Sequence, residues 1–365
     1  MLCLYFLLFS VEVIQAQITN TAIIDTTSGV KIKQITIGGY LDTYYAFDFN
    51  KPKNKIIPYF VSSNKHNEFA VNLGYLDLRY STQRIRARIV TGFGSYMESN
   101  YINEKGFFKN IVEASASVCL SKKKNIWLDA GVFGSPFTNE SAISKDHFLY
   151  TRSLAPEYVP YYLAGVKLAI PFNDKWNVYL YLLNGWQQIE DQNNAKSFAT
   201  QVEYRPTLKH LINWNMYVGD ERSFSQPNLR MRYFTDIYWL YKVSSKFNFI
   251  SCVYGGMQEY LNNQPTKSKV NYWWQANASG KWNLNERHSI SVRLEYFNDP
   301  TNAMIVNVIP NKPIYMSSVG GCYNYQLSEN ALFRLDGRLL HGKKEIYENA
   351  KHNAAIITGN LTVWF

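Results

Sequence analysis

Few side chains in this sequence have the types and spacing that support acid–base or nucleophilic chemistry. Six histidines fall in predicted loops or turns, and none forms an HxxxH or HExxH pair: His66, His147, His210, His288, His341 and His352. Ser141 and Ser144 lie near His147, but within one loop and outside any G-x-S-x-G context. The four cysteines show no CxxC or zinc spacing, and no glycine-rich phosphate loop occurs. We therefore expect no enzymatic activity, no metal site and no cofactor.

A second kind of chemistry is electrostatic, and it comes from charged residues on the polar faces of separate segments. The arginines of this set are Arg79, Arg86, Arg88, Arg205, Arg230, Arg232, Arg293, Arg334 and Arg338. The acids of the set include Asp236, Glu295 and Asp336. A basic ladder opposite carboxylates would line a pore, set a transverse field and give a mild preference for anions. The alternative is that these charges pair with one another and fill a narrow wall.

The segments that must position these charges alternate between apolar and polar residues with a period of two. In 331–339, for example, Ala331, Phe333, Leu335 and Leu339 oppose Arg334, Asp336 and Arg338. Period two predicts a strand with one apolar and one polar face. About sixteen such strands can be counted from Ile35 to Phe365, and in 68–81 the phase slips near Gly74, which suggests a bulge.

The connections between these strands alternate between long and short. The stretches 51–67, 98–110 and 136–161 are long, whereas 82–84 and 121–125 are short, and the same order continues along the chain. In lipid an open sheet edge leaves N–H and C=O groups unpaired, so only a closed barrel is stable. We therefore predict an all-β fold over 35–365, a transmembrane up-and-down antiparallel β-barrel of about sixteen strands with short periplasmic turns and long outer loops.

The longest connection, 136–161, is the sharpest candidate for a functional element. Its polar candidates are Glu140, Lys145, Asp146, His147, Arg152 and Glu157. Its apolar residues, which include Ile143, Phe148 and Leu154, are too numerous for a freely solvated loop. We expect this loop to fold inward and narrow the lumen. The alternative is an external loop packed on its neighbours.

Composition and the N-terminal residues limit the remaining classes. The net charge of +10 is dispersed, and the one dense basic run, Lys122–Lys124, falls in a predicted tight turn, so nucleic-acid binding is not expected. Residues 1–16 have the short apolar core of a secretory signal peptide, although no Lys or Arg precedes it. We expect 17–34 to form a periplasmic N-terminal segment that leads into the barrel.

The end of the sequence forms one more alternating strand. Phe365, Val363, Leu361 and Ile357 share one face of it. An aromatic final residue on such a strand resembles the C-terminal assembly signal of outer-membrane proteins, which implies the barrel-assembly machinery as a partner.

Three segments resemble the porin-2 family of outer-membrane barrels. They are 68–79 (EFAVNLGYLDLR), 133–144 (FGSPFTNESAIS, continuing to Tyr158) and 293–300 (RLEYFNDP). The resemblance extends over most of the chain. It implies an outer-membrane location in a Gram-negative bacterium and a porin-type fold, but no substrate and no catalytic residues.

From these observations we expect a porin for passive diffusion of small hydrophilic solutes. Outer-membrane lipid is an expected partner, and a homotrimer is a candidate assembly. A non-conducting barrel whose outer loops bind a ligand or partner is the alternative. A soluble secreted β-protein is a third hypothesis. A transporter with a plug domain would need about 22 strands, which this length cannot hold.

Overall fold

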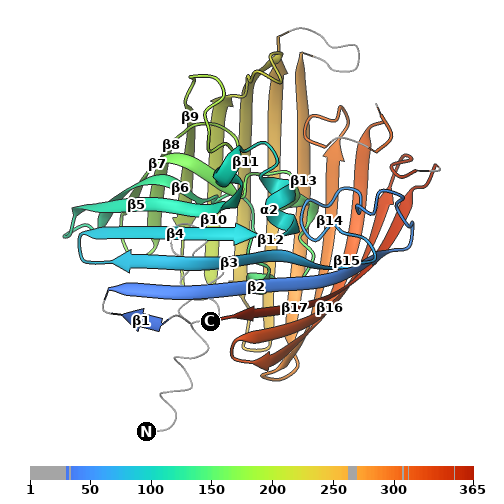
Figure 1. Cartoon of the computed structure of the whole chain (residues 1–365), viewed down its shortest axis with the longest axis horizontal. Coiled ribbons are helices and arrows are strands. Elements are labelled where there is room, and N and C mark those ends of the chain that lie inside the picture. The colour runs from blue at the N-terminus through green and yellow to red at the C-terminus, as the bar shows by residue number, and fades with distance from the viewer. Residues whose placement is uncertain (1–29, 33, 262–268, 306–307, 311, 349) are drawn as a thin grey trace.

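The computed structural model describes residues 30–32, 34–261, 269–305, 308–310, 312–348 and 350–365. Within these residues, sixteen strands from β2 to β17 form a ring in which each strand is antiparallel to both neighbours. The ring closes where β17 pairs with β2, beside the C-terminus (Figure 1). The prediction of a closed up-and-down barrel is confirmed.

The strands follow the chain in order around the ring. They are β2 (Ile35–Asp48), β3 (Phe69–Ser81), β4 (Ile85–Phe93), β5 (Ile111–Ser121), β6 (Ile126–Gly134), β7 (Tyr162–Pro171), β8 (Trp176–Leu183), β9 (Ser197–Tyr204), β10 (His210–Asp220), β11 (Leu229–Lys242), β12 (Phe247–Tyr260), β13 (Val270–Asn283), β14 (His288–Asp299), β15 (Ile314–Ser328), β16 (Ala331–Gly342) and β17 (Asn353–Trp364). A three-residue strand, β1 (Val30–Ile32), pairs with the start of β2. The predicted signal peptide lies outside the described residues.

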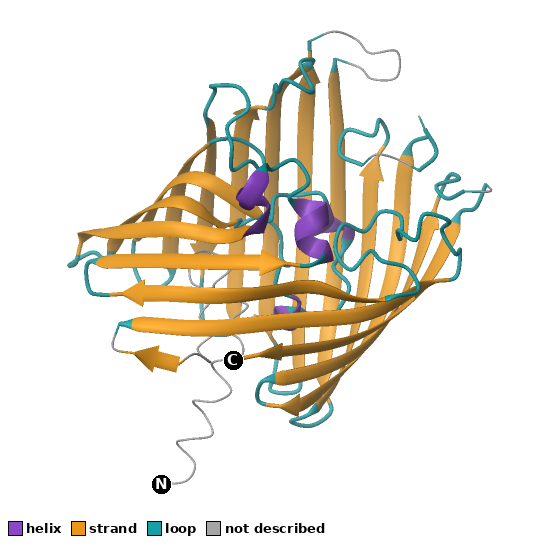
Figure 2. Ribbon diagram, in the orientation of Figure 1, coloured by secondary structure: helices purple, strands orange, loops and turns teal. Residues whose placement is uncertain are grey.

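Among the described residues, helix is confined to short turns in the connections, as Figure 2 shows. These turns are α2 (Ser95–Asn100), η1 (Gly106–Asn110), η2 (Ser144–Asp146) and α3 (Leu154–Glu157). In the part of the chain that the structure describes, none of them has the length and apolar character needed to cross a membrane.

The alternation read from the sequence gives the two faces of the wall. In β16, Phe333, Leu335 and Leu339 are exposed on the outside, whereas Arg334 and Arg338 are buried inside. An outward apolar surface faces lipid acyl chains, and the inward polar residues avoid them.

The phase slip expected near Gly74 is a β-bulge centred on Asn72. Val71 pairs with Thr43 and Leu73 with Asp42, so Asn72 is the extra residue. Its amide donates a hydrogen bond of 2.9 Å to Asp42 Oδ2, which turns the extra side chain inward. Such bulges locally bend a strand.

Three histidines were wrongly placed in connections. His210 and His288 are the first residues of β10 and β14, and His341 lies inside β16. The rings of His210 and His288 stack on tyrosines at centroid distances of 4.2 Å and 4.6 Å. A histidine ring that stacks on aromatic neighbours is compatible with a strand end as well as with a turn. The sequence alone therefore does not distinguish these two positions.

Closure of the barrel depends on a close approach between Phe365 and Gly39. Their backbones exchange two hydrogen bonds of 3.0 Å. The Phe365 ring lies over Gly39 so closely that a Cβ there would clash with two ring carbons. A side chain at position 39 would therefore displace the ring that seals β17 against β2.

Candidate functional site

The connection between β6 and β7 folds into the barrel, where most of its residues are buried. We name residues 135–161 the inward loop. Its two ends are joined by a 3.0 Å hydrogen bond from Ser135 N to Tyr161 O. Its apolar side chains, among them Phe137, Leu149 and Leu154, pack against inward-facing residues of the wall. The structure thus places this loop inside the lumen, as expected from its apolar content.

Three wall arginines hold the inward loop by its backbone. Arg293 Nη1 donates to Thr151 O at 2.5 Å, and Arg338 Nη1 donates to Arg152 O at 2.8 Å. Arg334 Nη1 donates to the carbonyl of Ser144 at 2.5 Å. The three arginine side chains are 0 to 1% exposed. They occupy the inner wall, but the loop covers them, so they anchor the loop rather than contact open solution.

Wall carboxylates bind the same loop through its backbone N–H groups. Asp336 Oδ2 accepts from Tyr150 N at 3.0 Å and from Thr151 N at 3.2 Å. Glu295 accepts from Leu154 N at 2.7 Å, and Asp236 accepts from Thr138 N at 2.9 Å. A buried charge needs such partners, and a buried N–H needs an acceptor. The predicted lining acids are therefore also loop anchors.

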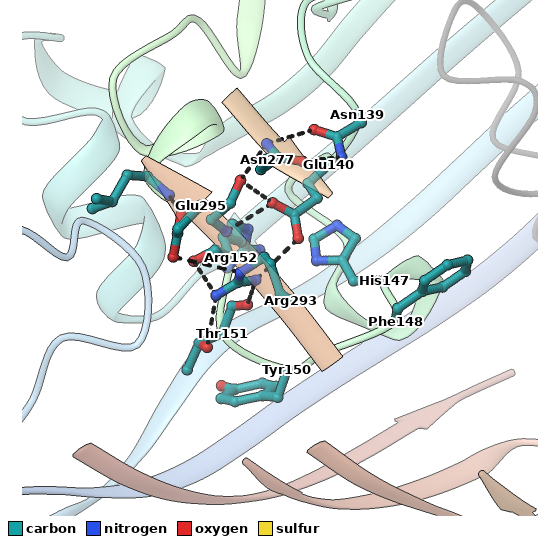
Figure 3. Close-up of polar contacts among 12 residues, drawn as sticks. Asn139, Glu140, His147, Phe148, Tyr150, Thr151, Arg152, Asn277, Arg293 and Glu295 are labelled. Atoms are coloured by element: carbon teal, nitrogen blue, oxygen red, sulfur yellow. Dashed lines mark hydrogen bonds and ion pairs between the residues drawn. The ribbon is translucent and has the colours of Figure 1, made fainter. Parts of the chain in front are cut away.

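The loop itself contributes a buried pair of charged residues, Glu140 and Arg152 (Figure 3). Glu140 accepts from Ser153 N and Ser153 Oγ at 2.7 and 2.6 Å and lies 3.3 Å from Arg293 Nη1. Arg152 donates to the carbonyl oxygens of Ser141 and Ala142. Both residues bond mainly to the loop backbone, so they fix the shape of the loop.

His147 and Glu157 are buried in the loop with shifted pKa values. Burial, and then the charges of Arg152, Arg334 and Arg293, holds the pKa of His147 well below its usual range. The neutral ring accepts a 3.0 Å hydrogen bond from Ser141 N at Nε2. Burial raises the pKa of Glu157 to about 7. Its carboxylate accepts bonds of 2.7 and 3.0 Å from the backbones of Val61 and Ser62, which joins the first outer loop to the inward loop.

Lys145 and Asp146 are the remaining predicted residues of the loop. They pair with one another at 3.0 Å, and the Lys145 ammonium lies 5.2 Å from the centre of the Trp364 ring. This contact places η2 against the last strand of the barrel.

The loop leaves open space on the opposite side of the lumen, along β3 to β8. A cavity of about 350 Å³ lies there, and Arg79, Arg86 and Arg88 line it. Asp77 pairs with Arg79 at 2.6 Å and with Arg88 at 2.7 Å, and Glu113 pairs with Arg88 at 2.7 Å. Of the nine predicted arginines, the structure brings these three together at open space.

The last three predicted arginines lie apart from that cavity. Arg205 pairs with Glu203 at 3.0 Å near the end of β9. Arg230 bonds to the carbonyl oxygen of Pro227 at 2.7 Å, at the outer rim. Arg232 donates to Gln258 at 2.8 Å, and its guanidinium lies 5.1 Å from the centre of the Trp186 ring.

Aromatic side chains cover the outer side of the open half. Tyr101 stacks on Tyr162 with ring centres 4.2 Å apart, and Tyr96 meets Tyr161 edge-on at 5.4 Å. Beneath them is a second cavity of about 60 Å³, which shares Arg88, Glu113 and Phe133 with the larger one. We call these four tyrosines the tyrosine cover.

Sequence reasoning missed Lys167, which also lines the larger cavity and pairs with Asp129 at 2.7 Å. The available signal was its position as the only charged residue of β7. It also missed the tyrosine cover, because tyrosine is frequent throughout this sequence and its spacing gives no sign of clustering.

The serine and histidine side chains considered for hydrolysis are engaged elsewhere. Ser144 Oγ donates to Asp42 Oδ2 at 2.9 Å and accepts from Arg334 Nη2 at 2.7 Å. His147 Nε2 accepts from the backbone of Ser141, as described above. Among the described residues, no cluster of three or more His, Cys, Asp or Glu is arranged to hold a metal ion.

A closed barrel of sixteen antiparallel strands with a charged interior and a loop folded into it is the architecture of an outer-membrane porin. The chain belongs to the family described as "Putative beta-barrel porin-2, OmpL-like", which matches residues 34–365. The protein is thus a porin-like barrel of the Gram-negative outer membrane.

Solved structures show the same fold at low sequence identity. OmpT, an outer membrane protein of Vibrio cholerae, in its trimer form gives a TM-score of 0.61 at 10% identity over 91% of this chain and 99% of that chain. An anion-selective porin from Comamonas acidovorans gives 0.61 at 9% over 91% and 99%. The outer membrane channel DcaP of Acinetobacter baumannii gives 0.61 at 10% over 92% and 99%. A comparison with curated proteins gives no match.

Proposed function

We propose that this protein is a passive pore for small hydrophilic solutes with a mild preference for anions. The observation that carries the proposal is the division of the lumen. The inward loop packs on the wall from β10 to β17, and the wall from β3 to β8 keeps a cavity of about 350 Å³ lined by Arg79, Arg86, Arg88 and Lys167. Fixed cations in a narrow aqueous space raise the local concentration of anions.

The solute route that we propose follows the wall from β3 to β8. It passes from the larger cavity, by Arg88 and Glu113, into the smaller cavity below the tyrosine cover. Passage to the outside then requires displacement of the tyrosine cover, of which Tyr96 lies in α2, Tyr101 and Tyr161 lie in loops, and Tyr162 is the first residue of β7.

Bilayer recordings of the refolded full-length chain test the pore. We expect discrete conductance steps, with a reversal potential in a KCl gradient shifted toward the chloride equilibrium potential. Arg79→Gln should shift the reversal potential toward the potassium equilibrium potential. Arg230→Gln, which removes the same charge at the outer rim, should leave the reversal potential unchanged. Absence of steps from a correctly folded barrel would support the non-conducting alternative, in which outer loops bind a ligand or partner.

The partners that we propose follow from the surface and the last strand. Exposed apolar residues cover the outer face of the strands, which suits outer-membrane lipid. Phe365 seals β17 on β2, which fits recognition of this strand by the barrel-assembly machinery. A homotrimer is consistent with the trimer form of the Vibrio cholerae OmpT fold. Because Ser144 and His147 are bound to other groups, we propose no enzymatic role for them.

A further inference from the structure

One arginine of the open cavity differs from its neighbours. Arg79 and Arg88 share Asp77, Arg88 also binds Glu113, and Lys167 binds Asp129. Four cations thus face three carboxylates at this wall, and the unmatched positive charge belongs to Arg86. Within the described part of the chain, the Arg86 guanidinium makes no hydrogen bond or direct ion pair, and the carboxylate that acts on it electrostatically is Asp129, which already binds Lys167 at 2.7 Å.

Arg86 is nevertheless held in a defined position. Its guanidinium carbon lies 3.7 Å from the centre of the Trp127 ring, a stacking distance. The indole is fixed in turn by a 2.7 Å hydrogen bond from Trp127 Nε1 to Asn125 Oδ1. Stacking holds the guanidinium plane and leaves its N–H edge free, and that edge matches the two oxygens of a carboxylate.

The rest of the lining suits an anion with an apolar body. Phe133, Tyr179, Ala87 and Ala169 line the same cavity as Arg86. The volume of about 350 Å³ lies in the range of small-molecule sites. One excess charge balances a monoanion, whereas a multiply charged phosphate would leave negative charge beside Asp129 and Glu113.

The basic run singled out in the sequence lies beside this cavity, because the next residue, Asn125, lines it. Lys122–Lys124 form the turn between β5 and β6, and Lys122 Nζ bonds at 3.1 Å to Gln83 in the neighbouring turn, which also carries Arg84. These side chains are exposed. A cluster of exposed cations beside a cavity attracts anions from the periplasmic side.

We propose that Arg86, stacked on Trp127, forms a binding site for a small monocarboxylate with an aromatic or apolar body, reached from the periplasmic mouth. The proposal rests on the proposed pore, because it assigns a solute class to the same cavity. Arg86 would supply the paired N–H donors, and Trp127 would orient them.

Equilibrium binding to the folded full-length chain in detergent tests the site without any need for conduction. Benzoate is the probe, benzylamine has the same ring with a positive charge, and inorganic phosphate is an anion without an apolar body. We expect calorimetric titration to show binding of benzoate in clear preference to the other two.

Arg86→Gln should weaken benzoate binding at least about tenfold, the loss expected for one charge-assisted bidentate contact. Arg287→Gln is the matched control, because it removes the same charge from an exposed turn, between β13 and β14, that does not line the cavity, and it should change affinity less than twofold. Trp127→Leu should weaken binding as well. Each variant is first checked for the heat-modifiable gel mobility of a folded barrel.

The site is overturned if benzoate does not bind, if Arg86→Gln and Arg287→Gln have equal affinity, or if phosphate or benzylamine binds as tightly as benzoate. Parallel bilayer recordings separate this outcome from failure of the pore. Binding without conductance steps would keep the site and remove the pore, and steps without binding would do the opposite.

Discussion

Removal of the Asp336 carboxylate should release the inward loop. Asp336 accepts hydrogen bonds from Tyr150 N, Thr151 N and Thr151 Oγ1. In Asp336→Ala, two buried backbone N–H groups lose their acceptor, at a cost of about 1–3 kcal/mol each. Water that enters the vacated space offsets part of this cost. We therefore expect the free energy of loop docking to fall by about 2 kcal/mol, which is roughly a thirtyfold increase in the undocked population.

Asp336→Asn should have a smaller effect. The amide oxygen can still accept from the two backbone N–H groups, and the amide NH₂ can donate to the Thr151 hydroxyl, so the change removes chiefly the charge. A loss of about 1 kcal/mol, or roughly fivefold in population, follows from the difference between charged and neutral hydrogen bonds.

Limited proteolysis of the folded barrel by trypsin measures this population. The bonds after Lys145 and Arg152 lie inside the lumen in the docked loop, so cutting there needs undocking, and its rate follows the open fraction. Cutting after Lys55, which is exposed in the first outer loop, serves as the internal reference. Asp77→Ala is the matched control, because Asp77 is a buried inward acid that binds Arg79 and Arg88 rather than the loop. A loop-cutting rate for Asp336→Ala within twofold of the unaltered protein would refute the anchoring role.

Four further predictions concern the loops and the closing strand. Deletion of 140–156 should raise single-channel conductance by emptying half of the lumen; unchanged conductance would contradict the proposed constriction. Tyr101→Ala should raise conductance by opening the tyrosine cover, and an unaltered step size would mean that solutes pass elsewhere. The pKa of Glu157 is about 7 in the docked loop, against a usual value of 4.5. Docking of the loop is therefore strongest at acid pH and weakens by up to about 3 kcal/mol as the pH rises from 4.5 through 7. Amide exchange of the loop measures this pH dependence, and Glu157→Gln should remove it. Phe365→Ala should lower the fraction of chain that reaches the heat-modifiable form, because the ring over Gly39 is lost; full assembly of that variant would exclude a role in closure.

The wall of the barrel could be predicted from the sequence because each strand carries its own alternation. The period of two alone predicts that Phe333 faces outward and Arg334 faces inward in β16. A break in the same period predicts the bulge at Asn72 to within two residues. The inward course of the loop was also visible, in the apolar residues between Phe137 and Val159.

The roles of the inward charges could not be predicted in the same way. Arg88 and Arg334 have the same local pattern, yet one lines a cavity and the other is buried under the loop. The difference depends on which part of the ring the loop contacts, and that is decided by side chains far apart in the sequence, such as Ser144 and Arg334. No local period carries this information.

The anchoring of the inward loop also has a consequence for the order of folding. The loop lies far along the chain from its anchors, since Ser144 precedes Arg334 by 190 residues and Arg152 precedes Arg338 by 186. Contacts of such high sequence separation form late and slowly, because the entropy of closing the intervening chain is lost before they form. Until β14 and β16 are in place, the loop lacks the anchors Glu295 and Asp336. Until the loop docks, Arg334 lacks the Ser144 carbonyl oxygen that it binds. We therefore expect loop docking to be the last and slowest step of assembly, because it needs the closed wall that carries its anchors.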